Sequence, residues 1–254
     1  MSEILRLSVS KVKTFQSCKL KYKYLYLDKR QRKEFDFYTF GKFCHKVLED
    51  FHKIYINGDD PPLNKSMSVC YKNALSEFSL TNDMKAECRI IIDKYLQQIS
   101  KNKSSIKNVL ACEKNFDFHV SNNVSLNGMI DKIQIDDDDV IHLIDYKSTK
   151  NKRYLENDWF QLLTYAYTIY LEDPNLEKIR ASYVLLRHDF EHITKEFNIK
   201  EVLEVKDKYL QYADEIMKEK EYKANPTSLC SFCDCYDICP SGGSGFSKYG
   251  EVNW

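Results

Sequence analysis

The first hundred residues carry apolar side chains at the spacing of helices. Ser8 or Ser10 can cap a first helix that runs to about Cys18, because a hydroxyl at that position accepts an orphan backbone N–H. Apolar residues then recur at three- and four-residue steps, as from Phe43 to Val47, which is the period of a helix with one buried face. We therefore predict three more helices, near 38–56, 64–79 and 82–101, within a mostly helical region over 38–107.

From Asn108 the pattern changes to that of strands. Three segments bounded by turn residues predict strands over 108–120, 124–135 and 140–149. Four consecutive aspartates, Asp136 to Asp139, separate the last two segments, and a polar hairpin turn explains them better than a metal site does. Downstream the pattern predicts a helix over 157–172, strands over 179–187 and 190–198, and a helix over 200–220. This order indicates an α/β or α+β sheet with a central crossover helix.

Composition narrows the class of protein. The 254 residues, of which 43% are hydrophobic and 13% aromatic, suffice for one folded domain. The tail after Pro240 holds four of the seven glycines, so we predict a single domain over 1–240 and a flexible tail over 241–254. No apolar run reaches the roughly 18 residues of a membrane span, and the first residues lack a secretory signal. We expect a soluble protein of the cytoplasm, or of the host-cell cytoplasm if it is viral, without a membrane partner.

The charges sum to zero but are unevenly placed. Between Lys11 and Lys33 there are nine Lys or Arg residues and one acid, Asp28. Aromatic residues such as Tyr24 and Tyr26 alternate with them, which suits a surface that tracks a nucleic-acid backbone and stacks on bases. A solvated helix face whose tyrosines enter the core would give the same pattern.

Two acids and a lysine fall on neighbouring strands of the predicted hairpin. Residues two apart share a strand face, so Asp145 and Lys147 point the same way while Tyr146 points opposite. If the hairpin pairs around its turn, Asp131 approaches the same region. Such a set is costly to desolvate without a cation or substrate, and its oxygen ligands suit Mg²⁺ or Mn²⁺ in phosphodiester hydrolysis. An exposed hairpin with ordinary salt bridges would also explain this spacing alone.

The surroundings of these residues resemble a known family. Three segments resemble motifs of the RecB-like PD-(D/E)XK nucleases: GMID ending at Asp131, IDYKS containing Asp145 and Lys147, and QLLTY from Gln161 to Tyr165. A fourth, GKFCHKVLE around His45, is similar to the helical G-xxx-H-xx-LE segment of that group. The resemblance extends from about Leu7 to Pro240 with its motifs in order, although 53–107 cannot be aligned residue by residue. The chain has no Walker A sequence and so no helicase motor.

The resemblance implies a role for each of these side chains. His45, Asp131 and Asp145 would bind the metal, and the backbone carbonyl of Tyr146 would add a ligand. Lys147 would position the attacking water and complete a catalytic set with Asp131, Asp145 and the helper Glu113, which matches an acidic position before motif II. Gln161 and Tyr165 would contact DNA. From its residue type alone, His45 would more often be a structural histidine. A separate transition-metal site formed with Glu49 and His52 along one helix side is a further, less favoured alternative.

Eight of the nine cysteines fall into two groups of four, and one stands apart. Because cytosolic thiols stay reduced, metal ligands or buried residues are expected rather than disulfides. Cys44, Cys70, Cys88 and Cys112 lie in apolar-patterned segments and are predicted core residues. Four others cluster near the end of the chain, and a ninth, Cys18, lies near its start.

Cys18 and the clustered cysteines resemble an iron-sulfur motif. The segment around Cys18 resembles the opening of the AddB nuclease domain and of the CRISPR-associated RecB-like exonucleases, and Cys230, Cys233 and Cys239 resemble their terminal triplet. The resemblance implies a 4Fe-4S cluster held by these four thiolates as a staple between the two ends. Residue types alone leave tetrahedral zinc open. Cys235 departs from the family pattern and is expected to be a bystander.

These observations together predict an α/β protein with a PD-(D/E)XK, restriction-endonuclease-like core in three layers, a helical N-terminal part and an iron-sulfur staple. The expected activity is Mg²⁺- or Mn²⁺-dependent cleavage of DNA, with single-stranded ends as the first choice of substrate, in repair, recombination or viral DNA processing. Two alternatives remain: a CRISPR-type nuclease that trims DNA beside an integrase, and a non-catalytic iron-sulfur DNA-binding subunit of a helicase-nuclease complex.

Overall fold

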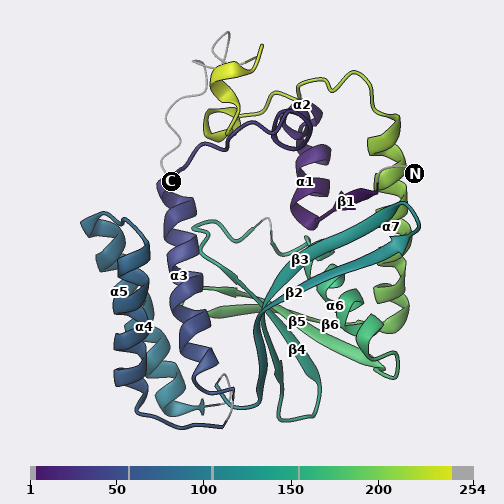
Figure 1. Cartoon of the computed structure of the whole chain (residues 1–254). Helices are drawn as coiled ribbons and strands as arrows, with labels where there is room; N and C mark the ends of the chain where they lie inside the picture. Colours follow the sequence, from purple (N-terminus) through teal and green to yellow (C-terminus); the bar gives the residue numbers. More distant parts are fainter. Residues whose placement is uncertain (1–3, 57, 104–105, 154, 242–254) are drawn as a thin grey trace. The chain divides into compact units, whose positions relative to one another are not determined.

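The computed structural model describes residues 4–56, 58–103, 106–153 and 155–241 (Figure 1). The predicted tail therefore lies outside the described residues, except for Ser241. The chain forms two compact units. Unit 1 comprises residues 1–35, 117–128 and 206–254, and unit 2 comprises residues 36–116 and 129–205. The single domain expected from the sequence stays a prediction.

One mixed sheet contains the strands of the described chain, in the order β1-β3-β4-β5-β6 with β2 paired to β3. Their bounds are β1 Leu5–Leu7, β2 Val109–Ser121, β3 Val124–Ile135, β4 Ile141–Lys147, β5 Lys178–Leu185 and β6 Glu191–Asn198. Strand β3 pairs antiparallel with β4, with Lys132 opposite Ile144 and Ile135 opposite Ile141. The hairpin around the aspartate turn is therefore confirmed.

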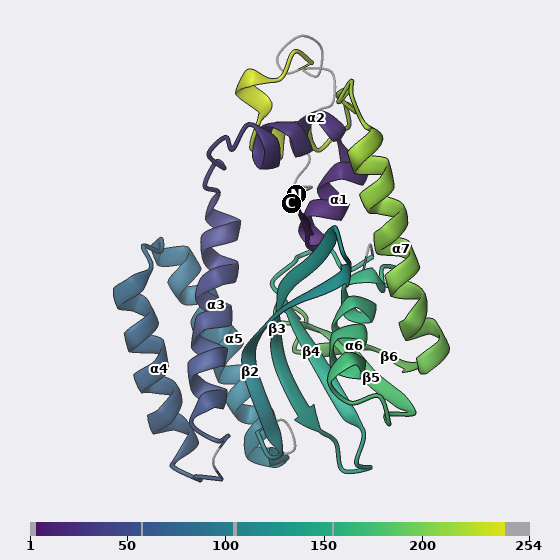
Figure 2. The same ribbon diagram turned by 45° about the vertical axis from the view of Figure 1, so that its right-hand side comes forward.

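Helices cover both faces of the sheet in unit 2. Helices α3 (Asp36–Lys53), α4 (Leu63–Glu77) and α5 (Asn82–Lys101) lie side by side (Figures 1 and 2). Their buried side chains form one core with Ile144, Tyr146 and Val184, which alternation places on one face of strands β4 and β5. Helix α6 (Phe160–Glu172) contacts the same two strands and crosses over between them, since β4 and β5 are parallel. The predicted α/β layering is thus present in this unit.

The helices of unit 1 lie near the start of the chain. Helix α1 (Val9–Ser17) begins after Ser8, whose hydroxyl accepts the N–H of Lys11, so the predicted cap is confirmed. Helix α2 (Lys19–Tyr22) continues into the π-helical turn η1 (Lys23–Leu27). Short 3₁₀ turns η3 (Cys230–Phe232) and η4 (Tyr236–Ile238) lie among the later cysteines, and helix α7 (Ile199–Lys218) contributes residues to both units.

Backbone and side-chain bonds join the first and last segments of unit 1. The N–H of Leu20 donates to the carbonyl of Lys223 at 3.3 Å, and the Asn225 amide donates to the carbonyl of Ser17 at 2.9 Å. The hydroxyl of Tyr24 donates to Ile238. These bonds connect the two segments of unit 1 directly.

No helix among the described residues is long and apolar enough to cross a membrane. Of the four cysteines predicted to be in the core, Cys44, Cys70 and Cys88 are buried, whereas Cys112 is half-buried.

Candidate active site

Strand β4 presents its acid and its lysine on one face, as alternation requires. Asp145 is 2% exposed and lies opposite Tyr183 of β5, which supplies a buried aromatic wall. The Lys147 ammonium nitrogen lies 2.7 Å from Asp145 Oδ2 and 5.3 Å from the centroid of the Tyr183 ring. The lysine is therefore fixed by a charge and by an aromatic face at once.

Helix α6 supplies donors and acceptors to this pair. Gln161 Nε2 donates to Asp145 Oδ1 at 2.8 Å, and Gln161 Oε1 accepts from Lys147 Nζ at 3.0 Å. Tyr165, one turn further along the helix, donates its hydroxyl to Asp145 Oδ1 at 3.1 Å and accepts from Gln161 at 2.8 Å. The QxxxY spacing thus brings both polar ends to Asp145, because residues four apart share a helix face.

A second group of side chains lies around Asp131 on β3. Asp131 Oδ2 accepts the backbone N–H of Tyr146 at 2.7 Å and lies 3.4 Å from His45 Nδ1 of helix α3. One turn before His45, Gly41 allows a close approach, since an added Cβ would lie 3.1 Å from Ser148 Oγ. A side chain at position 41 would require the Ser148 hydroxyl to shift slightly.

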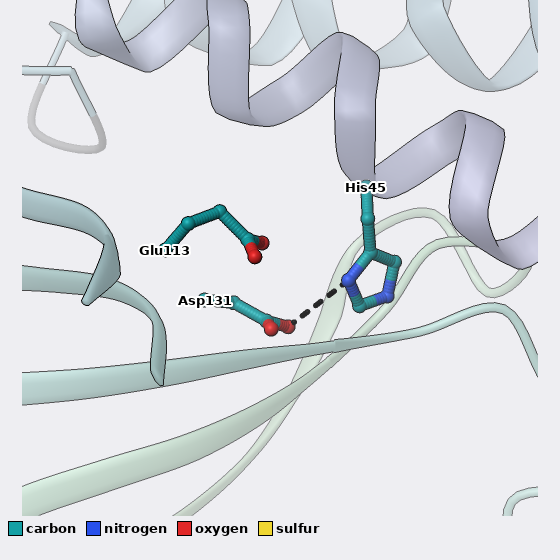
Figure 3. Close-up of side chains that lie close together, drawn as sticks. All are labelled: His45, Glu113 and Asp131. Atoms are coloured by element: carbon teal, nitrogen blue, oxygen red, sulfur yellow. Dashed lines mark ion pairs between the residues drawn. The ribbon is translucent and has the colours of Figure 1, made fainter. Parts of the chain in front are cut away.

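Glu113 completes this group from strand β2. Its backbone has φ of 51°, a left-handed conformation that is rare for a residue with a side chain and that re-aims a strand side chain where it occurs. One ligand atom each from His45, Glu113 and Asp131 lies within 4.8 Å of the others (Figure 3). An imidazole and two carboxylates converging in this way suit Mn²⁺ or Mg²⁺.

Electrostatics in this group reflect how closely the charges lie together. Burial opposes protonation of His45, but the Asp131 carboxylate outweighs burial and raises the pKa of His45 to about 9. The pKa of Asp131 is lowered correspondingly, because His45 and the Tyr146 N–H offset its burial. Burial, with Asp131 and Glu49 nearby, raises the pKa of Glu113 to about 7. A bound cation would compete with protons for these side chains, since metal binding normally releases protons from ligands.

Asp145 differs electrostatically from Asp131. Burial and the neighbouring Asp131 raise the pKa of Asp145, against the pull of Lys147. Its oxygens face Lys147, Gln161 and Tyr165, and it is not part of the three-residue group around His45. The structure thus brings Glu113, expected only to assist, into the group of possible ligands, while the ligand role of Asp145 stays a prediction.

The structure also shows the surroundings of three further residues with predicted roles, Tyr146, Tyr165 and His52. Tyr146 contacts Asp131 through its N–H, and the role of its carbonyl stays a prediction. Tyr165 is 4% exposed with its hydroxyl engaged, so its expected DNA contact also stays a prediction. His52 is buried, with Nε2 at 2.6 Å from the Tyr95 hydroxyl and Nδ1 at 2.6 Å from the Leu48 carbonyl. Both ring nitrogens are engaged, which removes the basis for a separate metal site with Glu49.

The predicted iron-sulfur cysteines lie in unit 1. Backbone N–H groups point to three of their sulfurs: Lys21 to Cys18 at 3.5 Å, Thr227 to Cys230 at 3.2 Å, and Cys235 to Cys233 at 3.5 Å. Such donors stabilise thiolates and tune clusters. Burial and the neighbouring Cys233 raise the pKa of the buried Cys235 to about 11. Burial also raises the pKa of Cys233.

Part of the basic N-terminal stretch is paired with acids of the C-terminal segment. Lys19 pairs with Glu219, Lys21 with Asp234 at 3.0 Å, and Lys33 with Asp237 at 3.5 Å. These lysines therefore join the two ends of unit 1. The nucleic-acid surface expected from the same stretch stays a prediction.

Sequence reasoning did not anticipate Tyr183 beneath Lys147 or the left-handed backbone at Glu113. Tyr183 has no motif of its own, and its role follows only from its place opposite Asp145 in a parallel pair. A glutamate inside a strand pattern likewise gives no sign of a positive φ.

Comparison with known proteins defines the class. A model of the PD-(D/E)XK nuclease superfamily matches residues 6–240. The chain therefore belongs to this nuclease superfamily.

Its fold is similar to that of a protein from Eubacterium rectale, provisionally assigned as an exonuclease, with a TM-score of 0.53 and 12% identity over 90% of this chain and 86% of that one. Another solved protein, SSO0001, is 17% identical over 87% of this chain and 94% of its own, with a TM-score of 0.36, which is too low to indicate a shared fold. No curated protein sequence matches.

Proposed function

We propose that this protein is a Mn²⁺- or Mg²⁺-dependent DNA exonuclease of the RecB-like, AddB-like iron-sulfur branch, acting on single-stranded DNA ends. The observation that supports it best is the convergence of His45, Glu113 and Asp131 beside Lys147. Superfamily membership supports phosphodiester hydrolysis, and the residues of unit 2 supply the groups that this chemistry needs.

His45, Glu113 and Asp131 would hold the ion, with Asp145 facing it from the next strand. When bound, such an ion supplies Lewis-acid activation of water and stabilises the departing oxygen. His45 and Glu113 would have to be deprotonated to serve as ligands, so cation binding would release any proton that they hold. The donor set contains an imidazole, which favours Mn²⁺ somewhat more than an all-oxygen set does.

Lys147 would position the attacking water. Its ammonium already donates to Gln161 Oε1, and its contact with Asp145 keeps the charge at the strand end. From there it can donate to the nucleophile and offset the negative charge that grows on the phosphoryl oxygens. Gln161 and Tyr165 orient Asp145 and Lys147, and Gln161, which faces both, is the better placed of the two to meet the substrate.

A 4Fe-4S cluster on Cys18, Cys230, Cys233 and Cys239 would join the ends of unit 1. The N–H donors to three of these sulfurs support it. Cluster ligation would add to the lysine-acid pairs that already connect the two segments. The role of the staple is structural in this proposal, and no catalytic step passes through it.

The test combines metal analysis with cleavage of labelled DNA. Protein purified without oxygen is assayed for iron, sulfide and zinc, and is then given end-labelled single- and double-stranded DNA with Mn²⁺, Mg²⁺ or EDTA. We expect iron near four per chain and Mn²⁺-dependent release of label from single strands. Cleavage within circular single strands would contradict the exonuclease, and zinc in place of iron would contradict the cluster. Iron without any cleavage would contradict catalysis and favour a DNA-binding subunit.

A further inference from the structure

Unit 2 contains a cavity of about 540 Å³ on the face of its sheet opposite Asp131 and Asp145. Alternation along the strands separates the two places: Asp131 points to the candidate active site, whereas its neighbour Lys132 lines the cavity together with Gln134. On β4, Tyr146 lines the cavity, whereas its sequence neighbours Asp145 and Lys147 point to the opposite face of the sheet. The cavity is therefore distinct from the catalytic group.

One wall of the cavity is aromatic. Tyr95 and Phe190 lie against each other with ring centroids 4.7 Å apart, and both are buried. Tyr146 adds a third ring to the lining. The small parts of these rings that reach the lining make this side of the cavity apolar, and an aromatic ligand could contact them at their edges.

The opposite wall carries a buried acceptor that lacks a partner. Gln134 is 6% exposed and donates Nε2 to Asp136 at 2.8 Å. Among the described residues, no group donates to its Oε1. Buried acceptors are normally satisfied, so a ligand N–H would complete the hydrogen bonds of this side chain. Lys132, fully buried beside it, offers N–H donors in either protonation state.

The charges around the cavity favour a neutral ligand. Arg180 is already held by Asp136, Asp138 and Glu196, at 2.7 Å, 2.7 Å and 3.1 Å. Asp137 adds another carboxylate to the lining, so a phosphate meets repulsion there. A cationic ligand would be repelled by Lys132 and Arg180, which also line the cavity.

We propose that this cavity binds a neutral nucleobase or nucleoside. A base has flat apolar faces for Tyr95 and Phe190, ring N–H groups for Gln134 Oε1, and carbonyl or ring-nitrogen acceptors for Lys132. The volume lies within the range of small-molecule sites. The inference does not rest on the nuclease activity, since it concerns the other face of the sheet.

Calorimetric titration with adenosine, guanosine, cytidine and thymidine, and with their 5′-monophosphates, tests the proposal. At least one nucleoside should bind, and more tightly than its monophosphate. Gln134→Leu should weaken binding by about tenfold or more, the effect of one lost hydrogen bond to a buried group, without loss of thermal stability. Lys147→Ala, at the candidate active site, should bind the nucleoside as the wild type does.

A second variant, at an exposed position of the lining, tests the cavity without changing the buried Gln134. Gln98 is exposed and lines the cavity, so Gln98→Trp should block it, whereas Gln97→Trp, one exposed position earlier and outside the lining, should not. Absence of nucleoside binding at millimolar concentration would overturn the proposal. So would equal or tighter binding of monophosphates, or binding that Lys147→Ala abolishes and Gln98→Trp leaves intact.

Discussion

Lys147 is restrained on three sides, by Asp145, by Gln161 and by the ring of Tyr183. A side chain with four rotatable bonds loses much conformational entropy when it is held so closely. Fixing a charge in advance of the reaction is what electrostatic catalysis requires, because no reorganisation is then needed as charge develops. The three contacts hold the ammonium group at the end of strand β4.

Replacement of Lys147 by methionine, which keeps the apolar stem over Tyr183, should lower kcat by about 10²–10⁴-fold. Thermal melting and iron content should stay close to the wild type. The control is Lys178→Met, an exposed lysine of the same unit, which should cleave DNA normally. Wild-type cleavage by Lys147→Met would remove the proposed mechanism.

A variant of Tyr165 can distinguish a role in positioning Asp145 from a direct contact with DNA. Its hydroxyl donates to Asp145 while the ring is buried, so Tyr165→Phe should lower kcat by about tenfold, the scale of one hydrogen bond, with little change in KM. A contact with the substrate would instead raise KM at unchanged kcat. Steady-state kinetics on a labelled single strand distinguishes the two.

Strand β2 has a left-handed backbone conformation at Glu113. Left-handed conformation costs roughly 1–2 kcal/mol for a residue with a Cβ. Such strain gathers at functional sites, where the rest of the structure enforces it. Glu113 can therefore be tested for both its backbone and its carboxylate.

Glu113→Ala and Glu113→Gly both remove the carboxylate and should both weaken Mn²⁺ binding, by at least about tenfold. The glycine variant should be the more stable of the two by about 1 kcal/mol, because glycine adopts positive φ freely. Urea unfolding and Mn²⁺ titration measure the two effects. Equal Mn²⁺ affinity in wild type and variants would show that Glu113 is no ligand.

Helix α3 carries a second histidine with an opposite electrostatic character. Burial, and after it Lys132, hold the pKa of His52 well below its ordinary value of 6.5. Unfolding lets this imidazole take up a proton. Its contribution to the free energy of unfolding is therefore fully present above pH 6.5 and is lost as the pH falls toward the lowered pKa.

Urea unfolding at about pH 7.5 and pH 5.5 should reveal this loss as a slope of up to about 1.4 kcal/mol per pH unit. His52→Gln should be less stable at the higher pH, since it loses part of the contacts with Tyr95 and Leu48. Its stability should nevertheless fall less on acidification. Parallel losses in both proteins would contradict a neutral buried His52.

Much of the fold could be predicted from periodicity. The helices α3, α4 and α5 and strands β2 to β6 lie within a few residues of their predicted ranges, because the helices have a regular apolar period and the strands are apolar segments bounded by turn residues. Strand β1, with three residues, is too short to show a period, and its pairing with β3 depends on distant sequence. Motifs predict His45, Asp131 and Asp145 as the metal ligands, whereas the place of Glu113 beside His45 and Asp131 goes with a left-handed backbone that no sequence pattern shows.

At the scale of the whole molecule, neither unit is continuous in sequence. Unit 1 is assembled from three segments, and its first and last segments share hydrogen bonds and ion pairs. Closing so long a loop costs chain entropy that grows with the logarithm of its length. Any bond that fixes the ends should therefore stabilise the unit strongly.

Cys233→Ser and Cys235→Ser form a matched pair in the same turn. Cys233→Ser should lose iron and lower the melting temperature by several degrees, whereas Cys235→Ser should keep both, because the family resemblance gives the ligand role to Cys233 and leaves Cys235 a bystander. Iron analysis and thermal melting check both variants. Full iron in Cys233→Ser would show that the ligands are wrongly assigned.

The pairing of the first segment with the last also sets an order of events during synthesis. A ribosome releases the residues of α1 and α2 long before those around Cys230 and Cys239, and domains generally fold from the N-terminal side as they emerge. Unit 2 can gather its strands and helices while translation continues, but α1 and α2 must wait for their partners. Until the ribosome releases the last cysteines, the basic N-terminal segment is an exposed, unpaired chain, open to proteases and chaperones in the cell.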